Sequence, residues 1–592
     1  MSRLTCRSLS PAALAAGFVL TGCGDTASPP KAEADLVLRG AAVYTAAPSV
    51  SGATALAVRD GRLVYVGSDS GVARWIGPKT RVAELAGRMV LPGFHDSHVH
   101  PIESGIDLGE CQLPDVSNLR AVTDSIRACA TQHPEARWIR GAGWALPLFR
   151  NANPSRHLLD SLVPDRPAFL VAADGHSAWA NSKALAAAGI TRETPDPPRG
   201  RIERDASGAP SGTLREAAVG LMSKALPPRT HEEQVAGLRR ALAEAARVGI
   251  TSMYEANANE AELAAYAELD RKGELTARVI AAQHVNPAEG PAQVAQLVER
   301  RERYKGAKYF RPLGAKIFAD GVIEAQTAAL LRPYLGHGND RGVANLEPAE
   351  FNRLTAALDS AGFQIHIHAI GDRGVRWSLD ALEYVTQTNG PRDRRPLIAH
   401  LQLIDPADIP RFRTLGVIAD FQPLWAYADS YIKELTVPVL GAARSAHLYP
   451  IGSVARTGAL VVGGSDWSVT SLNPLEAIEV GVRRLAPNDT VSNPWLPTER
   501  VGLDTLLLAY TANGAYAQQQ ERETGTLEVG KAADLIILDR DLLAIPAPQI
   551  HDTKVLLTLL EGREVYRAPG FTAVPPAPTA PTAAMVTRPK RR

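Results

Sequence analysis

The sequence predicts an α/β protein whose main domain is a TIM-like (β/α)8 barrel, and three observations support this prediction. Short apolar runs alternate with helical stretches along the middle of the chain. Several of those runs end in histidine, lysine or aspartate. Strand-like pieces without intervening helices stand at both ends of the chain. Because the strands of a parallel barrel all end on one face, we expect the functional site there.

The first barrel run leads into a histidine-rich stretch. Apolar residues 89–91 meet a Pro-Gly break, and residues 95–100 then read His-Asp-Ser-His-Val-His. His98 and His100 are two residues apart, so on an extended strand both side chains project from the same face. Two imidazoles at that spacing can bind one divalent ion. For this motif taken alone, the alternative is a histidine-rich surface loop.

Four later runs carry polar side chains where apolar strands should end. Residues 363–368 alternate in polarity, 397–400 are apolar up to the last residue, 460–466 turn on glycines, and 313–321 surround one lysine with apolar residues. The side chains that these runs deliver are Lys316, His366, His368, His400 and Asp466. Together with the first motif they predict one cluster at the carboxyl ends of the strands.

These motifs, in this order, resemble the amidohydrolase superfamily, and within it family 3, which includes N-substituted formamide deformylases. The resemblance covers about residues 34–567, and its other elements are 368–372 (HAIGD) and 464–467 (GSDW). It implies a metallo-hydrolase barrel with two divalent ions, expected to be zinc. His98, His100 and Asp466 would hold the buried ion, and His368 and His400 the outer one.

Lys316 is the unusual member of this set. A protonated ammonium beside two dications is electrostatically untenable, so we expect a neutral amine. In similar enzymes a lysine on this strand reacts with carbon dioxide to give a carbamate that bridges the two ions. The alternative is an unmodified Lys316 beside a single metal ion.

The resemblance implies a metal-dependent amidohydrolase acting on a small molecule. A metal-bridging hydroxide would cleave a C–N bond of an amide, N-formyl, N-acyl or cyclic imide group. Asp466 would take the proton and return it to the leaving amine. The alternatives are carbamate, lactone or ester hydrolysis by the same site, and a catalytically silent lipoprotein that binds ligands at the cell surface.

Other polar and aromatic residues receive secondary assignments. His366 is expected one layer deeper than His368, as a hydrogen-bonded core residue, and His284 is also expected in the core. His95 and Asp96 could orient the metal ligands or could be plain turn residues. Four tryptophans hint at an aromatic or apolar group near the site: Trp144, Trp179, Trp425 and Trp467. His176 and Trp144, both in the predicted insertion, are the candidates for substrate contact.

The predicted domains follow from the strand pattern and the spacing of the motifs. More than 200 residues separate the first motif from Lys316, whereas three barrel units need about 90–100. The surplus predicts an insertion over the barrel mouth, which we place at about 101–230. The ranges are 1–22 signal peptide, 23–34 tether, 35–92 and 516–568 the two parts of a small β-sandwich, 93–515 barrel, and 569–592 disordered tail.

The composition and the N-terminal residues indicate where in the cell the protein is located and which kinds of partner it binds. The formal net charge is +1 without basic blocks in the body of the chain, which argues against a nucleic-acid partner. Residues 20–23 (Leu-Thr-Gly-Cys) resemble a bacterial lipobox. We therefore expect an exported protein anchored by a lipid on Cys23, on the periplasmic side and at the outer membrane. An ordinary secretory signal is the alternative, and oligomerisation is left open.

The remaining cysteines do not form a structural zinc motif. The chain has four cysteines and no CxxC spacing, which leaves histidine and carboxylate as ligands and suits a catalytic zinc. After export and lipidation, only Cys111 and Cys129 would remain. A disulfide between them and two separate thiols are both compatible with the sequence.

Overall fold

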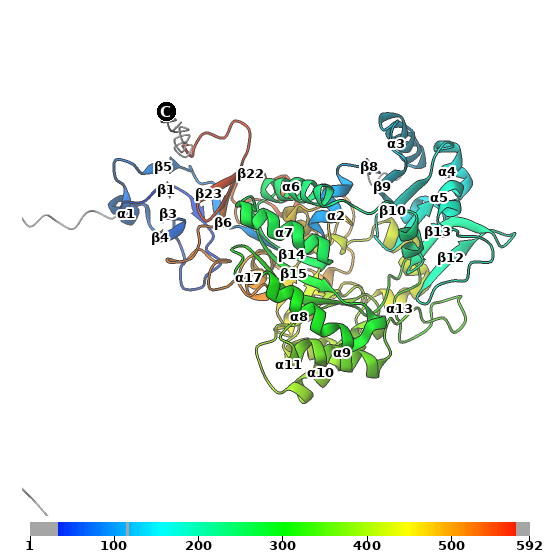
Figure 1. The fold of residues 1–592 in the computed structure, drawn as a ribbon. Coiled ribbons are helices and arrows are strands. Elements are labelled where there is room, and N and C mark those ends of the chain that lie inside the picture. Colours follow the sequence, from blue (N-terminus) through cyan, green and yellow to red (C-terminus); the bar gives the residue numbers. More distant parts are fainter. Residues whose placement is uncertain (1–32, 114–117, 576–592) are drawn as a thin grey trace, which may run out of the picture.

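The computed structural model describes residues 33–113 and 118–575 and shows three parts (Figure 1). A parallel barrel lies in the middle, a β-sandwich built from both chain ends lies on one side, and the insertion lies on the other. The predicted α/β barrel class is confirmed. The signal peptide, Cys23 and nearly all of the tether lie outside the described residues.

Eight parallel strands make the barrel, and each pairs with its sequence neighbour in the sheet. In order, the strands are β7 (Phe94–Val99), β14 (Ile250–Ala258), β15 (Arg278–His284), β16 (Phe310–Phe318), β17 (Gln364–Ala369), β18 (Leu397–His400), β19 (Ile418–Phe421) and β20 (Val461–Gly463). The apolar runs of the sequence indicate six of these strands, including β14 from residues 249–254, but not β15 or β19.

The first and last strands meet where the barrel closes. The backbone N–H of Asp466, just after β20, donates to the carbonyl of His98 on β7 at 2.7 Å. Gly464 permits this approach, because a Cβ at that position would collide with the backbone N and Cβ of His98. This junction carries residues of both sequence motifs, so closing the barrel also assembles part of the site.

Apolar packing fills the barrel interior below the site. Residues of five strands form an interior cluster that includes Tyr254, Ile280, Leu397, Ile418 and Val462, all at most 1% exposed. Strands buried on both faces are expected to be continuously apolar, which explains why the short run 397–400 could be recognised. The interior below the site is therefore a packed core and not a pore.

Helices surround the barrel and follow most of its strands (Figure 1). The longest are α6 (His231–Arg247) and α10 (Asp372–Asn389), and α6 begins at a capping box formed by Thr230 and Glu233. The other main helices are α2 (Pro101–Asp107), α7 (Glu260–Lys272), α8 (Val294–Arg303), α9 (Pro348–Ser360), α11 (Ile409–Leu415), α14 (Ile451–Arg456), α15 (Pro474–Arg483), α16 (Leu503–Ala509) and α17 (Ala512–Ala517).

The β-sandwich consists of two sheets that share one apolar core. One sheet contains β4 (Arg62–Gly67), β3 (Ala55–Arg59), β1 (Leu36–Arg39) and β5 (Arg81–Glu84). The other contains β2 (Ala42–Val43), β6 (Met89–Pro92), β21 (Leu535–Leu538), β22 (Val555–Leu560) and β23 (Arg563–Arg567). Phe571 and Val574 are buried in this core, so the predicted disordered tail does not begin at 569. Ala34, assigned to the tether, is buried too.

The insertion is a separate mixed sheet flanked by helices. Its strands are β12 (Gly200–Arg204), β13 (Pro210–Glu216), β11 (Ser177–Ala180), β10 (Ala168–Ala172), β9 (Ile139–Trp144) and β8 (Cys111–Gln112), and its helices are α3 (Leu119–Gln132), α4 (Arg156–Leu162) and α5 (Ser182–Ala187). Cys111 and Cys129 form a disulfide that ties β8 to α3. The insertion starts later than residue 101, because α2 packs on α6 as a barrel helix.

Among the described residues, no helix combines the length and the apolar character needed to span a bilayer.

Candidate metal centre

Ionisable side chains from six barrel strands converge at the carboxyl ends of those strands. They are His98 and His100 (β7 and the residue after it), Lys316 (β16), His366 and His368 (β17), His400 (β18), Asp420 (β19) and Asp466 (after β20). The register between β16 and β17 places Lys316 opposite His366 and Phe318 opposite His368, so these side chains lie at similar heights along the barrel axis. The structure thus brings together all six residues that sequence reasoning assigned to the metal site.

One compact group contains His98, His100 and Asp466, whose candidate ligand atoms all lie within 4.8 Å of one another. Asp466 Oδ1 lies 3.2 Å from His100 Nε2 and 3.5 Å from His98 Nε2. His98 is fully buried, whereas the His100 side chain is 22% exposed. This group could hold one metal ion and keeps one edge open toward the barrel mouth.

A second group contains His98, His366 and Asp420. Asp420 Oδ2 lies 3.6 Å from His98 Nδ1 and 3.7 Å from His366 Nε2. All three side chains are completely or almost completely buried. Sequence reasoning missed Asp420, although residues 417–420 (Val-Ile-Ala-Asp) follow the same pattern of an apolar run that ends in a polar side chain. His366 is fully buried and its Nε2 pairs with His98 Nδ1 at 3.0 Å, which confirms the prediction of a hydrogen-bonded core residue. The same residue nevertheless belongs to this metal-competent group.

Lys316 lies inside this cluster and is completely buried. Its Nζ is 3.1 Å from His98 Nε2. Burial lowers the pKa of Lys316 to about 8, although the carboxylates of Asp466, Asp420 and Glu255 oppose that change. The amine therefore has a much larger neutral fraction at neutral pH than an exposed lysine.

His368 and His400 stand side by side with ring centroids 4.5 Å apart. The ring of His400 stacks on Trp425, and its Nδ1 pairs with Gln422 Oε1 at 2.9 Å. His368 Nδ1 faces Asp320 Oδ1 at 3.4 Å. Asp320 accepts three backbone N–H groups, from Ala329, Ile370 and Gly371, so its contacts are structural.

Surrounding polar residues hold the histidine motif in place. Asp96 Oδ1 accepts the backbone N–H groups of His98 and Ser465 and so links the two strands that meet at the barrel closure. His95 Nδ1 pairs with Gln518 Oε1 at 3.1 Å. His100 Nδ1 lies 3.4 Å from Glu255 Oε1, a neighbour that the sequence analysis did not find. These contacts are of the kind that orients metal ligands.

The electrostatics of the cluster fit a divalent metal. Burial, together with the neighbouring cationic groups, puts the pKa of His98, His366, His368 and His400 well below the usual histidine value. Neutral imidazole is the form that binds metals. Among the described residues, His366 Nδ1, His368 Nδ1 and both carboxylate oxygens of Asp420 find no hydrogen-bond partner, although all four atoms are buried. Buried polar atoms of this type are expected where a metal ion accepts their lone pairs.

The two predicted substrate contacts have different positions. His176, from the insertion, reaches the cluster, with its ring centroid 5.2 Å from that of His368 and its Nδ1 2.9 Å from Glu216 Oε2. Trp144 does not, because it is fully buried in the core of the insertion and donates its Nε1–H to the Leu170 carbonyl. This burial corrects the prediction that Trp144 contacts substrate.

His284 was predicted to lie in the core, but its side chain is exposed and its Nδ1 pairs with Asn257 Oδ1.

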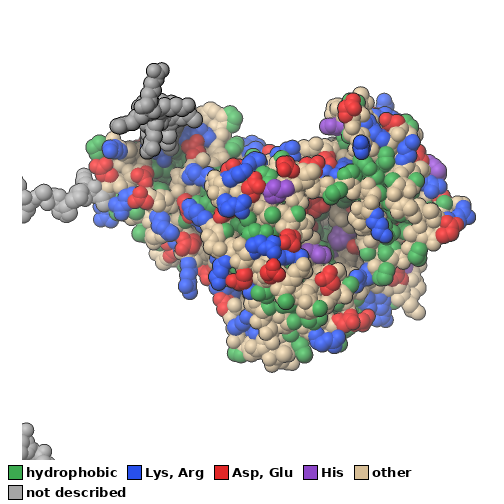
Figure 2. Space-filling model, viewed as in Figure 1, with side chains coloured by type: hydrophobic (Ala, Val, Ile, Leu, Met, Phe, Trp, Pro, Cys, Tyr) green, Lys and Arg blue, Asp and Glu red, His purple; other side chains and the backbone are tan. Residues whose placement is uncertain are grey.

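A hollow separates the insertion from the barrel, and histidine side chains are visible inside it (Figure 2). The site is therefore reached between these two parts of the molecule.

A comparison with models of protein families shows to which family the chain belongs. The model of the amidohydrolase family matches residues 81–566. The chain belongs to this family. Protein LONG AFTER FAR-RED 3 of Arabidopsis thaliana is 31% identical over 551 residues, which cover 90% of this chain and 92% of that protein. N-substituted formamide deformylase of Arthrobacter pascens is 29% identical over 552 residues, covering 90% and 99%.

Solved structures agree with the family assignment. A metal-dependent hydrolase from Pyrococcus horikoshii OT3 matches with a TM-score of 0.68 and 25% identity, covering 86% of this chain and 99% of that one. A metal-dependent hydrolase from Pyrococcus furiosus matches with a TM-score of 0.65 over the same shares. With the His/Asp groups of the cluster, these matches make the chain a metal-dependent hydrolase of the amidohydrolase family.

Proposed function

We propose that the protein hydrolyses a C–N bond in a small molecule, as an amide, N-formyl, N-acyl or cyclic imide, with two zinc ions at this centre. The observation that carries the proposal is the metal-competent group of His98, His100 and Asp466, with Lys316 Nζ 3.1 Å from His98 Nε2. The rings of His400 and His368 follow beside it, with centroids 4.6 Å from His98 to His400 and 4.5 Å from His400 to His368. Two ions bound there would supply Lewis-acid activation of water and of the scissile carbonyl. The relative from Arthrobacter pascens, named for formamide deformylation, supports this class of bond.

The proposed ligands extend the sequence assignment. His98, His100 and Asp466 hold one ion, and His368 and His400 contribute to the other, as the resemblance implied. Asp420 and His366 are added as further candidates, because Asp420 Oδ2 lies 3.6 Å and His366 Nε2 lies 3.0 Å from His98 Nδ1. Lys316 would be N-carboxylated and could then offer carbamate oxygens to the ions. Its burial supports this, since the neutral amine can attack carbon dioxide to form a carbamate with release of one proton.

Asp466 is the proposed proton carrier. Burial would raise the pKa of its carboxyl group, but in the metal-free centre the hydrogen bond and charge of His100, with the charges of Lys316 and His368, outweigh burial and hold that pKa below its usual value. A metal ion bound to Asp466 and His100 would favour the ionised carboxylate in place of the His100 proton. The carboxylate is therefore ionised at neutral pH and can accept the proton of the attacking water, then return it to the leaving amine. His176 is the proposed substrate contact: with Nδ1 bound to Glu216, its Nε2 remains available to donate to a substrate oxygen.

A chelation and substrate experiment tests the function. Protein lacking residues 1–23 is assayed on N-benzylformamide, N-benzylacetamide and benzyl acetate, before and after chelator treatment and again after zinc is added. The proposal expects hydrolysis of at least one of the two C–N substrates, loss with chelator and recovery with zinc. Turnover of the ester alone would favour the ester or lactone alternative. No turnover of any substrate in the zinc-loaded protein would contradict the enzymatic proposal.

We also propose that the protein is exported and lipid-anchored through Cys23 on the periplasmic side of the outer membrane. The lipobox-like residues 20–23 support this location. So does the Cys111–Cys129 disulfide, since disulfides persist mainly in oxidising compartments. Fractionation of cells should place the intact chain in the outer membrane and the Cys23→Ser variant elsewhere. Recovery of both forms in the cytoplasm would contradict the proposal.

A further inference from the structure

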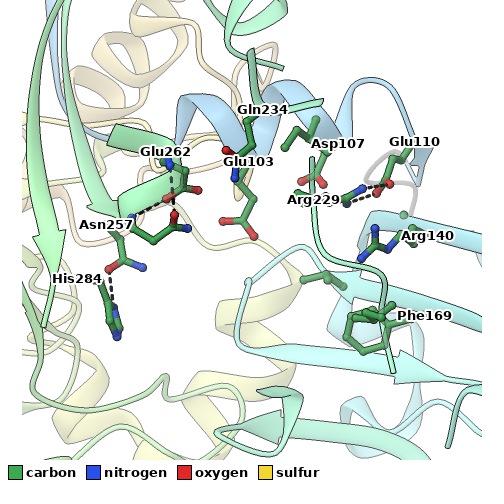
Figure 3. A pocket seen from close by; sticks show the side chains of 15 residues that line it. Glu103, Asp107, Glu110, Arg140, Phe169, Arg229, Gln234, Asn257, Glu262 and His284 are labelled. Carbon is green, nitrogen blue, oxygen red and sulfur yellow. Dashed lines mark hydrogen bonds and ion pairs between the residues drawn. The ribbon is translucent and has the colours of Figure 1, made fainter. Parts of the chain in front are cut away.

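A second cavity, of about 460 Å³, lies between the insertion and the barrel (Figure 3). Its barrel side comes from α2, α6, α7 and the end of β14, and its other side comes from the insertion strands β9 and β10. Figure 3 shows Glu103 and Asp107 between Glu262 on one side and Arg140 on the other. This volume lies in the range of about 300–1,000 Å³ that is usual for small-molecule sites.

Acidic groups outnumber basic ones in this cavity. Glu110 forms a bidentate ion pair with Arg229, so these two charges cancel. The carboxylate of Glu103 makes no hydrogen bond or ion pair with any described residue. Asp107 has one contact, from the Ser468 hydroxyl at 3.2 Å, and Glu262 accepts the backbone N–H of Asn259 at 2.8 Å. Three carboxyl groups therefore face the single remaining cation, Arg140, which itself donates to the Pro227 carbonyl.

These carboxyl groups affect one another across the cavity. Burial and then the charge of Glu103 raise the pKa of Asp107 to about 8. Burial and then the charge of Glu255 raise the pKa of Glu262 to about 8, with Glu103 adding to the shift. Like charges held close together are unfavourable, and a bound cation would relieve that repulsion.

A separate observation also indicates a ligand with hydrogen-bond donors. Gln234 of α6 lines the same cavity, and its side chain is only 6% exposed. Its Oε1 is buried and has no hydrogen-bond partner among the described residues. A buried amide oxygen that accepts no hydrogen bond destabilises the folded state, so we expect a ligand to donate a hydrogen bond to it. None of the groups of described residues that could hold a metal ion includes a residue of this cavity, which favours an organic cation.

The cavity wall lies close to the metal centre, and Glu255 stands between them. The backbone N–H of Asn257, in the cavity wall, donates to Glu255 Oε1 at 3.0 Å. The same oxygen lies 3.4 Å from His100 Nδ1. Glu103 lies on α2, the helix that begins immediately after His100. These contacts place the cavity wall one hydrogen bond from Glu255, which neighbours the proposed metal ligand His100.

We propose that this cavity is a specificity subsite for a cationic group, a protonated amine or guanidinium, at the far end of the substrate from the scissile bond. The inference rests on the proposed function, because it describes the substrate of the same centre. Glu103 supplies a negative charge, a bound cation would favour ionisation of Asp107 and Glu262, and the Gln234 side-chain oxygen accepts an N–H group.

A matched pair of amides tests the charge preference. N-(5-aminopentyl)acetamide and N-hexylacetamide have the same length, but only the first ends in an ammonium group. We expect kcat/KM to favour the cationic amide by about tenfold or more, and we expect Glu103→Gln to reduce that ratio by about fivefold. Glu232→Gln is the matched control: it removes the same charge from an exposed position of α6 outside the cavity and should leave the ratio unchanged.

A binding measurement separates this inference from the catalytic proposal. Calorimetric titration with 1,5-diaminopentane and with 1-hexanol requires no turnover. Binding of the diamine alone, weakened in Glu103→Gln, supports the subsite even if neither amide is hydrolysed, in which case only the proposed function fails. Equal turnover of both amides with no diamine binding would overturn the subsite and leave the hydrolase proposal standing. A diamine affinity that is the same in parent and Glu103→Gln would also overturn it.

Discussion

Asp420 and His98 face each other at the centre of the barrel, with 3.6 Å between Oδ2 and Nδ1. Both side chains are buried, and neither oxygen of Asp420 has a hydrogen-bond partner in the described part of the chain. Burial raises the pKa of the Asp420 carboxyl group well above its usual value. A buried carboxylate is stabilised chiefly by a paired cation, so this contact makes sense where a metal ion is bound.

Replacing Asp420 by asparagine should separate metal binding from folding. We expect Asp420→Asn to weaken metal affinity by about 100-fold, because an amide is a poorer ligand than a carboxylate. In metal-free protein the substitution should not lower stability, since it removes a charge that burial disfavours. Metal titration and urea unfolding measure the two effects. Asp165→Asn, at a side chain that is 68% exposed, is the control. Unchanged metal affinity in Asp420→Asn would contradict the assignment.

Asparagine is also the informative replacement at Asp466. The residue has φ of 51°, a left-handed conformation that asparagine tolerates better than alanine does. Asp466→Asn should therefore keep the fold but lower kcat by about 10²–10⁴-fold, because the amide cannot accept the proton. The readout is kcat of zinc-loaded protein, with metal content measured in parallel. A kcat within a few-fold of the parent would rule out Asp466 as the proton carrier.

The His176–Glu216 pair predicts a pH-dependent contribution to stability. Burial disfavours the charged imidazole, but Glu216 outweighs burial and raises the pKa of His176 to about 9. A raised folded pKa gives stability that is complete below the unfolded value of about 6.5 and is lost as pH rises toward 9. In chelator-treated protein, the difference in unfolding free energy between parent and His176→Gln should shrink over this window. A difference that stays constant from pH 6 to pH 9 would contradict the prediction.

The disulfide should stabilise the insertion. Cys111 and Cys129 are 18 residues apart in sequence, and closing a loop of that size contributes about 3 kcal/mol. We expect reductant, or the Cys111→Ser/Cys129→Ser double variant, to lower the stability of the insertion by about that amount. Limited proteolysis at residues 113–230 with and without reductant measures the effect. Equal protection in both conditions would show that the disulfide is dispensable.

Much of the fold follows from short apolar runs that end in polar side chains. The run 397–400 could be recognised as a strand because buried parallel strands are continuously apolar. The register of β16 with β17 then places Lys316 beside His366, a relationship that the sequence pattern does not contain. The strand β19 was missed because it has only four residues and one of them is an aspartate. A short segment that contains an aspartate also resembles an ordinary turn.

The insertion was the part least accessible to sequence reasoning. Trp144 and His176 lie in the same segment, and only the packing shows that one is core and the other reaches the metal centre. Sequence separation did not show that Cys111 and Cys129 are close, because loop length alone does not fix distance. The residues of the second cavity come from the barrel and the insertion together, so no local motif could indicate it.

The most direct test of the proposed centre is the metal content per chain of zinc-loaded protein lacking residues 1–23, compared with Lys316→Ala. The proposal predicts two metal equivalents in the parent and one or none in the variant, because the buried lysine bridges the two ions. Lys305→Ala, at a side chain that is 80% exposed, should retain both equivalents. One equivalent in the parent and in Lys316→Ala alike would contradict the bridged centre and remove Lys316 from the mechanism.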